Sequence, residues 1–154
     1  MKRSEQVVAA LNKNLEAELS AISKYSLQVG VLQNWGYSKL ATKLKEIAKQ
    51  EREHSEELID RVVFLSCGLT RFSPVVTAAE PDVPGMLEAN RTLENQAIED
   101  YNKAANTACQ QDDNGSRDLF THILKEEENH LQFFVAQLRQ IGQMGLDNYL
   151  SSQV

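Results

Sequence analysis

The sequence is poor in cysteine, glycine and proline, and it contains no long hydrophobic run. Its two cysteines, Cys67 and Cys109, form no Cys-x-x-Cys pair, which excludes a rubredoxin-like iron site and a zinc ribbon but leaves their roles open. No apolar stretch reaches the roughly 20 residues that a membrane-spanning helix needs. Residues 1–5 carry charges with no apolar run behind them, which predicts no secretory signal. We therefore expect a cytoplasmic protein that does not enter a membrane.

The scarcity of helix breakers favours helix along most of the chain. Only 7 Gly and 3 Pro occur in 154 residues, and long stretches lack both. A hydrophobic content of 42% and a charged content of 25% are ordinary for a globular protein. The net charge of −6 argues against a nucleic-acid partner. We expect a single domain over residues 1–154, long enough to bury a core.

Apolar spacing and breakers predict an all-α fold with four long helices. We expect these over about 4–34, from 37 or 38 to 67–68, from 83 or 84 to a turn at 112–116, and from that turn to the glycines at 142 and 145. Ser4 and Ser116 are the candidate caps of the first and fourth helices. Residues 146–150 leave room for a short fifth helix.

The segment from Leu69 to about Pro84 predicts a long connection without regular structure, and it holds all three prolines. A tight turn would make the second and third helices antiparallel neighbours. A long link can instead cross the bundle and let them run parallel.

One pattern of carboxylates and histidines occurs twice. A lone glutamate is followed 33 positions later by a Glu-x-x-His pair (51 − 18 and 127 − 94), and the second copy lies 76 positions after the first (94 − 18, 127 − 51 and 130 − 54). The six residues are Glu18, Glu51, His54, Glu94, Glu127 and His130. This ligand set is typical of a di-iron or di-manganese carboxylate site inside a four-helix bundle.

All six residues fall on the apolar stripes of the predicted helices, so they are expected to face the core. Residues three apart share a helix face, so each Glu-x-x-His pair can bind one metal centre. Solvated surface charge would explain a single Glu-x-x-His, but buried carboxylates must be paired or bind a metal. Four glutamates and two neutral imidazoles balance two divalent cations, and oxygen-rich ligation without thiolate favours iron or manganese.

Two tyrosines extend the duplication. Tyr25 and Tyr101 each follow the lone glutamate of their copy by seven residues (25 − 18 and 101 − 94). This spacing places each phenol two turns along the same helix face, where it could hydrogen-bond a ligand carboxylate. A structural hydrogen bond is the favoured interpretation over a role as one-electron donor. His122 lies off the ligand stripe, and we expect an exposed or capping side chain there.

The residues resemble those of the bacterioferritins along essentially the whole chain. Besides the six ligands, the resemblance is carried by Asn34-Trp35-Gly36 and by Met144-Gly145-Leu146-Asp147-Asn148-Tyr149-Leu150. It implies a ferritin-like four-helix bundle with a long crossover and a short fifth helix. It also implies a hollow homo-oligomeric shell of 24 subunits that oxidises Fe²⁺ with O₂ or H₂O₂ and stores ferric mineral.

The resemblance further assigns roles to the six residues around two iron ions per subunit. By this analogy Glu18 and Glu94 are terminal ligands, and Glu51 and Glu127 bridge the irons. The histidines His54 and His130 would each bind one iron.

Two departures from the family pattern bear on other iron sites. Bacterioferritins usually bind haem b through a methionine directly after the second-helix ligand, and Arg52 stands there. Arginine has no thioether and stays protonated, so we expect no haem in a homomer. An inner-surface iron site of some relatives uses positions occupied here by Glu46 and Gln50; Glu46, with Glu126, remains a candidate for such a site.

The sequence therefore predicts a ferroxidase and iron-storage subunit. One alternative is another di-metal oxidase, either a rubrerythrin-like peroxidase or a manganese catalase, and the missing Cys₄ module argues against the first. Another alternative is a shell subunit that co-assembles with a haem-binding bacterioferritin partner.

Overall fold

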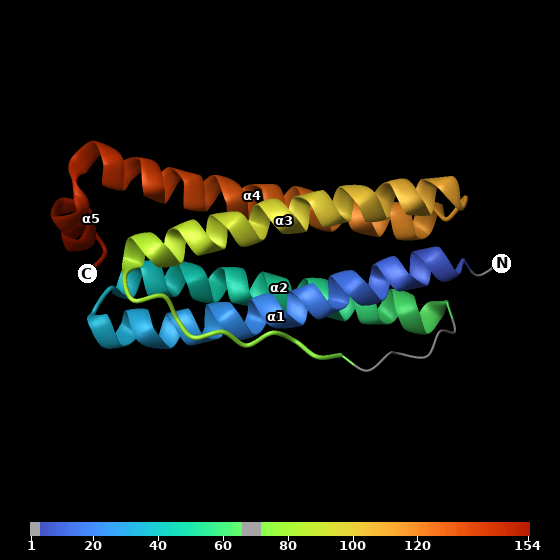
Figure 1. Cartoon of the computed structure of the whole chain (residues 1–154), viewed down its shortest axis with the longest axis horizontal. Helices are drawn as coiled ribbons and strands as arrows, with labels where there is room; N and C mark the ends of the chain where they lie inside the picture. Colours follow the sequence, from blue (N-terminus) through green and yellow to red (C-terminus); the bar gives the residue numbers. More distant parts are fainter. Residues whose placement is uncertain (1–3, 66–71) are drawn as a thin grey trace.

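The computed structural model describes residues 4–65 and 72–154. Every regular element in these ranges is a helix: α1 (Glu5–Trp35), α2 (Ser38–Phe64), α3 (Val83–Gln110), α4 (Asn114–Met144) and the short α5 (Leu146–Ser152). Helices α1 and α2 form one antiparallel hairpin, α3 and α4 form the other, and α5 lies across one end of the bundle (Figure 1). The expected all-α bundle with a short fifth helix is confirmed.

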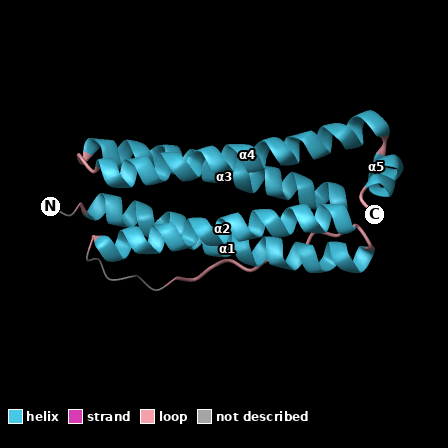
Figure 2. Cartoon of the chain, turned by 180° about the vertical axis from the view of Figure 1, so that it is seen from behind, coloured by secondary structure: helices cyan, strands magenta, loops and turns pink. Residues whose placement is uncertain are grey.

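Helices α2 and α3 point in the same direction, and residues 72–82 of the link between the hairpins run back along the bundle (Figure 2). Its described part is held along α1. The backbone N–H of Ser73 donates to Glu16 (3.1 Å), that of Val75 donates to Ser20 Oγ (2.9 Å), and Lys24 Nζ pairs with Glu80 (2.9 Å). The predicted crossover is therefore confirmed.

Helix ends follow from local residues. Gly36, at φ +86°, ends α1 in the left-handed conformation that glycine adopts without steric cost. Ser4 Oγ accepts from the backbone N–H of Val7 at 3.4 Å, and Asp82 accepts from Gly85 at 2.7 Å at the start of α3. The expected end of the second helix at 67–68 lies outside the described residues, and α2 is a helix as far as Phe64.

The predicted capping role of Ser116 is wrong. Helix α4 begins at Asn114, and Asp113 is its N-cap: its Oδ1 accepts from the backbone N–H of Ser116 at 3.0 Å, and its Oδ2 accepts from Ser116 Oγ at 2.8 Å. A carboxylate three residues upstream can satisfy the free N–H groups of the first turn, so the helix starts earlier than the serine indicated.

The core consists of two apolar clusters at opposite ends of the bundle. One contains Leu11, Leu58 and Phe120, and the other contains Leu44 and Phe134, with all five side chains buried. On every long helix, the residues of one cluster are separated from those of the other by the predicted ligand positions. The bundle therefore carries a polar layer across its middle, with apolar packing on both sides.

Candidate metal centre

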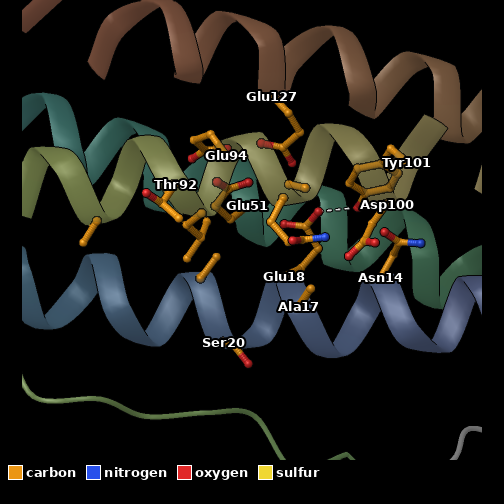
Figure 3. Close-up of a pocket in the computed structure, with 15 residues that line it drawn as sticks. Asn14, Ala17, Glu18, Ser20, Glu51, Thr92, Glu94, Asp100, Tyr101 and Glu127 are labelled. Atoms are coloured by element: carbon orange, nitrogen blue, oxygen red, sulfur yellow. Dashed lines mark hydrogen bonds between the residues drawn. The ribbon is translucent and has the colours of Figure 1, made fainter. Parts of the chain in front are cut away.

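The polar layer gathers all six residues that the sequence singled out. Glu18 comes from α1, Glu51 and His54 from α2, Glu94 from α3, and Glu127 and His130 from α4. Each is at most 4% exposed. Figure 3 shows the four carboxylates approaching one another between the helices.

The six residues form two overlapping groups. Potential ligand atoms lie within 4.8 Å of one another in the group Glu18, Glu51, His54 and Glu127, and equally in the group Glu51, Glu94, Glu127 and His130. Both groups share Glu51 and Glu127. The arrangement provides two adjacent positions for cations with two carboxylates common to both.

Both histidines turn Nδ1 toward this centre. His54 Nδ1 lies 3.0 Å from Glu51 and 3.2 Å from Glu127. His130 Nδ1 lies 3.0 Å from Glu127 and 3.3 Å from Glu51. Nδ1 is therefore the ring nitrogen available for a metal, provided that Nε2 carries the proton.

The opposite ring nitrogens contact residues that sequence reasoning did not connect with the histidines. His54 Nε2 lies 2.6 Å from Glu126, and His130 Nε2 lies 2.9 Å from Gln50. Each partner precedes the shared glutamate of the opposite helix, and the two positions keep the repeat of 76 (126 − 50). That spacing was the available signal for this pair.

The structure does not join the proposed inner-surface pair. Glu46 is an exposed residue that pairs with Lys43 at 3.1 Å, whereas Glu126 contacts His54. None of the hydrogen bonds or ion pairs among the described residues connects Glu46 to Glu126. An accessory iron site there stays a prediction.

The two tyrosines contact the centre across the hairpins. Tyr25 donates a hydrogen bond to Glu94, and Tyr101 donates one to Glu18; the second bond is drawn in Figure 3. Burial, followed by the neighbouring carboxylates, raises the pKa of both phenols well above the usual value. Each tyrosine thus stays protonated and donates to the lone glutamate of the other copy.

The electrostatics of the centre reflect four carboxylates in a desolvated space. Burial, then repulsion from Glu51 and Glu127, raises the pKa of Glu18 and of Glu94 well above its usual value. Burial alone would raise the pKa of Glu127, but hydrogen bonds from His130 and His54 lower it.

The histidines respond in the opposite direction. Burial alone would lower the pKa of His130, but hydrogen bonds to Glu127 and Glu51 raise it to about 9. Burial is likewise outweighed at His54, whose pKa rises through hydrogen bonds to Glu127, Glu18 and Glu51. Protons balance the carboxylates here in the way that divalent cations would, and metal binding must release those protons.

The donor set fits divalent iron or manganese. Glu94 Oε2 is buried and is among the side-chain atoms of the described residues that lack a hydrogen-bond partner. Such an atom is costly unless a cation binds it. A cavity of about 400 Å³ between α1 and α3 reaches Glu18 and Glu94 and leaves space beside them.

Other residues named by the sequence lie outside the centre. Arg52 is exposed on α2, beside a surface hollow of about 250 Å³ that Lys45 and Lys49 also line.

His122 is exposed, 3.8 Å from Glu57, as expected for a histidine off the ligand stripe. Cys109 is an exposed free thiol, and Cys67 lies outside the described residues. None of the helices in the described ranges is long and apolar enough to span a membrane.

Comparison with known families agrees with the bundle and its centre. The family model for ferritin, described as a ferritin-like domain, matches residues 8–144. The chain therefore belongs to the ferritin-like family.

Three bacterial members of that family show how far the similarity extends. The chain is 34% identical to a bacterial ferritin of Pseudomonas aeruginosa, with both chains covered completely. It is 34% identical to a bacterial ferritin of Synechocystis sp., over 100% of this chain and 99% of the relative. Identity to a bacterioferritin of Brucella melitensis is 32%, over 97% of this chain and 92% of the relative. The resemblance to bacterioferritins is thereby confirmed.

Proposed function

We propose that the protein is a ferroxidase and iron-storage subunit that oxidises Fe²⁺ with O₂ or H₂O₂ at the buried centre. Fe²⁺ is the substrate, and each ion gives up one electron. With peroxide, two Fe²⁺, one H₂O₂ and two protons yield two Fe³⁺ and two waters. The observation that carries this proposal is the pair of overlapping ligand groups that share Glu51 and Glu127.

The residues have distinct tasks in this reaction. Glu51 and Glu127 hold the two irons at a fixed separation, and Glu18 and Glu94 each bind one of them. His54 and His130 complete the two positions through Nδ1. The four carboxylates favour the higher charge of Fe³⁺, and Tyr25 and Tyr101 hold the terminal carboxylates in place.

A cavity beside the site offers space to its substrates. The cavity between α1 and α3 offers room for Fe²⁺ and for a small oxidant next to Glu18 and Glu94 (Figure 3). Most of its lining is apolar, with Ala17, Ala21 and Leu93 in the wall, and Asp100 at its edge pairs with Lys13 at 2.8 Å. A small uncharged oxidant enters such a lining at less cost than a divalent cation does.

Storage in a shell extends the proposal beyond the single chain. The ferritin-like family and the bacterial relatives support a cytoplasmic homo-oligomer, for which we propose 24 subunits around a ferric mineral, each chain being one domain. A subunit of a mixed shell is the second candidate. It is favoured by Arg52, whose guanidinium lacks the thioether that would ligate haem iron, so a haem would require a partner subunit.

The test is anaerobic loading of the purified shell with increasing Fe²⁺, followed by rapid mixing with O₂ or H₂O₂. We expect a fast rise in ferric absorbance that saturates at two irons per subunit, no Soret band, and iron that sediments with the shell. Glu94→Ala and His130→Ala should each slow the fast phase by more than the about 10–100-fold that loss of an outer partner costs a metal site.

Glu56→Ala is the matched control, because Glu56 is an exposed glutamate on α2. Its rate should equal that of the wild type. Initial rates near the wild-type value in both ligand variants would show that the reaction occurs elsewhere.

A further inference from the structure

The duplicated centre departs from symmetry in the residues behind its two histidines. The inner ligands match in kind: each metal position has one lone glutamate, one histidine and a share of Glu51 and Glu127. Behind the rings, His54 Nε2 meets the carboxylate of Glu126 at 2.6 Å, and His130 Nε2 meets the amide oxygen of Gln50 at 2.9 Å. Both histidines therefore have an outer partner at the equivalent position, but this partner is charged for His54 and neutral for His130.

This difference in charge acts directly on ligand strength. When Nδ1 binds a metal, Nε2 carries the proton and donates it to the outer partner. A carboxylate acceptor forms a charge-assisted hydrogen bond, roughly twice as strong as a bond to a neutral acceptor. Through it the imidazole becomes more electron-rich and a stronger ligand, whereas an amide oxygen gives a weaker effect.

We propose that Glu126 makes the position of His54 the tighter of the two metal positions, and that Gln50 leaves the position of His130 the weaker. Metals then fill the centre in order, first with Glu18, Glu51, His54 and Glu127, and second beside His130 and Glu94. Glu126 and Gln50 are positioning residues that act through the histidines. This inference rests on the proposed di-metal function.

Partial exposure of both outer partners does not remove the difference. The side chain of Glu126 is 35% exposed, so solvent weakens its field, but its contact with a fully buried imidazole is short. Gln50 is exposed to an intermediate degree as well, so the two contacts are matched in setting. Exchanging the two residues therefore tests the charge and not the environment.

The experiment is titration of the metal-free protein with Co²⁺ under nitrogen, followed by calorimetry and by visible absorbance. The wild type should bind two Co²⁺ per subunit in steps whose dissociation constants differ by about 10-fold or more. His130→Ala should keep the tight step, and His54→Ala should lose it.

Two isosteric substitutions separate charge from structure. Glu126→Gln keeps an acceptor for His54 and should weaken the tight step by about 10–100-fold, so that the two steps merge. Gln50→Glu should instead strengthen the weak step, a gain that no structural damage produces. In the double exchange Gln50→Glu/Glu126→Gln the order should reverse, so that His54→Ala added to it leaves the tight step in place. Glu128→Gln, which removes an exposed charge from the same helix, should change neither step.

The outcomes distinguish this inference from the proposed function. Two equal steps in the wild type, or two steps that Glu126→Gln leaves unchanged, would overturn the ordered filling while the di-metal centre stands. Binding of fewer than two Co²⁺ per subunit would overturn both.

Discussion

The α1–α2 hairpin and the α3–α4 hairpin each give the centre one lone glutamate, one Glu-x-x-His pair and one tyrosine. Around these matching groups the hairpins differ. Leu58 in α2 stands where α4 has Phe134, 76 positions later, and Gln50 stands where α4 has Glu126. Under the proposed di-metal function, the metal geometry would fix these groups, so they repeat, whereas their surroundings need only fill space and satisfy polar atoms. The comparison teaches that a centre with duplicated ligands can still have two unequal sides.

The two hairpins differ first in their apolar packing, which substitutions of Phe134 and Leu58 test. Phe134 is fully buried, and its ring stacks on Tyr25 with centroids 6.0 Å apart, so it supports the tyrosine that bonds Glu94. Phe134→Ala should lower the free energy of unfolding by about 3–5 kcal/mol, and Leu58→Ala by an amount toward the lower end of about 2–5 kcal/mol.

Denaturant unfolding of the metal-free proteins measures both values, and Co²⁺ titration follows the centre. Phe134→Ala should also weaken metal binding, because Tyr25 loses the ring that holds it. The comparison fails if Leu58→Ala loses as much free energy of unfolding as Phe134→Ala, or more, and if Phe134→Ala binds metal as the wild type does. The two hairpins would then pack the centre equivalently.

A buried amide pair marks the second difference. Gln28 and Asn90 are fully buried and exchange hydrogen bonds of 3.0 and 2.8 Å between α1 and α3. Asn14, at the corresponding position of the first copy, instead donates to Ala10 of its own helix at 2.9 Å. The hydrogen-bonded amide pair therefore joins α1 to α3 on one side of the centre. On that side Gln28 also donates to Glu80 of the link at 2.8 Å.

Gln28→Leu should lower the free energy of unfolding by about 1–3 kcal/mol, because the amide of Asn90 is left buried without its partner. The double variant Gln28→Leu/Asn90→Leu should recover part of that loss, since neither polar group then remains unpaired. Thermal or denaturant unfolding of the three proteins checks this. If Asn90→Leu lowered the free energy of unfolding of the Gln28→Leu variant by a further about 1–3 kcal/mol, the two amides would act independently.

Much of the fold and the inner centre could be predicted because both depend on residues of one helix at a time. Apolar stripes, Gly36 at the end of α1 and Pro84 in the first turn of α3 indicate where helices run, and residues three apart share a face. Contacts between helices were harder. Tyr25 was expected to bond a ligand carboxylate, but only the packing of α1 against α3 makes that carboxylate Glu94. Gln50 was not identified as a partner of His130, because it lies off the apolar stripe and meets the ring across the bundle.

The helix caps carry the smallest of the three differences. Ser4 caps α1 with one long hydrogen bond of 3.4 Å, whereas Asp113 caps α4 with bonds to Ser116 and pairs with Arg61 Nη2 at 2.6 Å. Burial alone would raise the pKa of Asp113, but the hydrogen bonds from Ser116 and the charge of Arg61 lower it below the usual value.

Asp113→Ala should lower the free energy of unfolding at neutral pH by about 0.5–2 kcal/mol, and Ser4→Ala should fall at the low end of that range. A depressed pKa means that the stabilisation is complete above the unfolded-state pKa of about 3.9 and is lost as the pH falls through the lower folded-state value. The difference between wild type and Asp113→Ala should therefore shrink below about pH 4, while that of Ser4→Ala, which involves no titrating group, should stay constant. Unfolding midpoints of the wild type and both variants, measured from neutral to acidic pH, test this. A stability difference between wild type and Asp113→Ala that persists unchanged into acid would show that the charge of Asp113 contributes nothing to the cap.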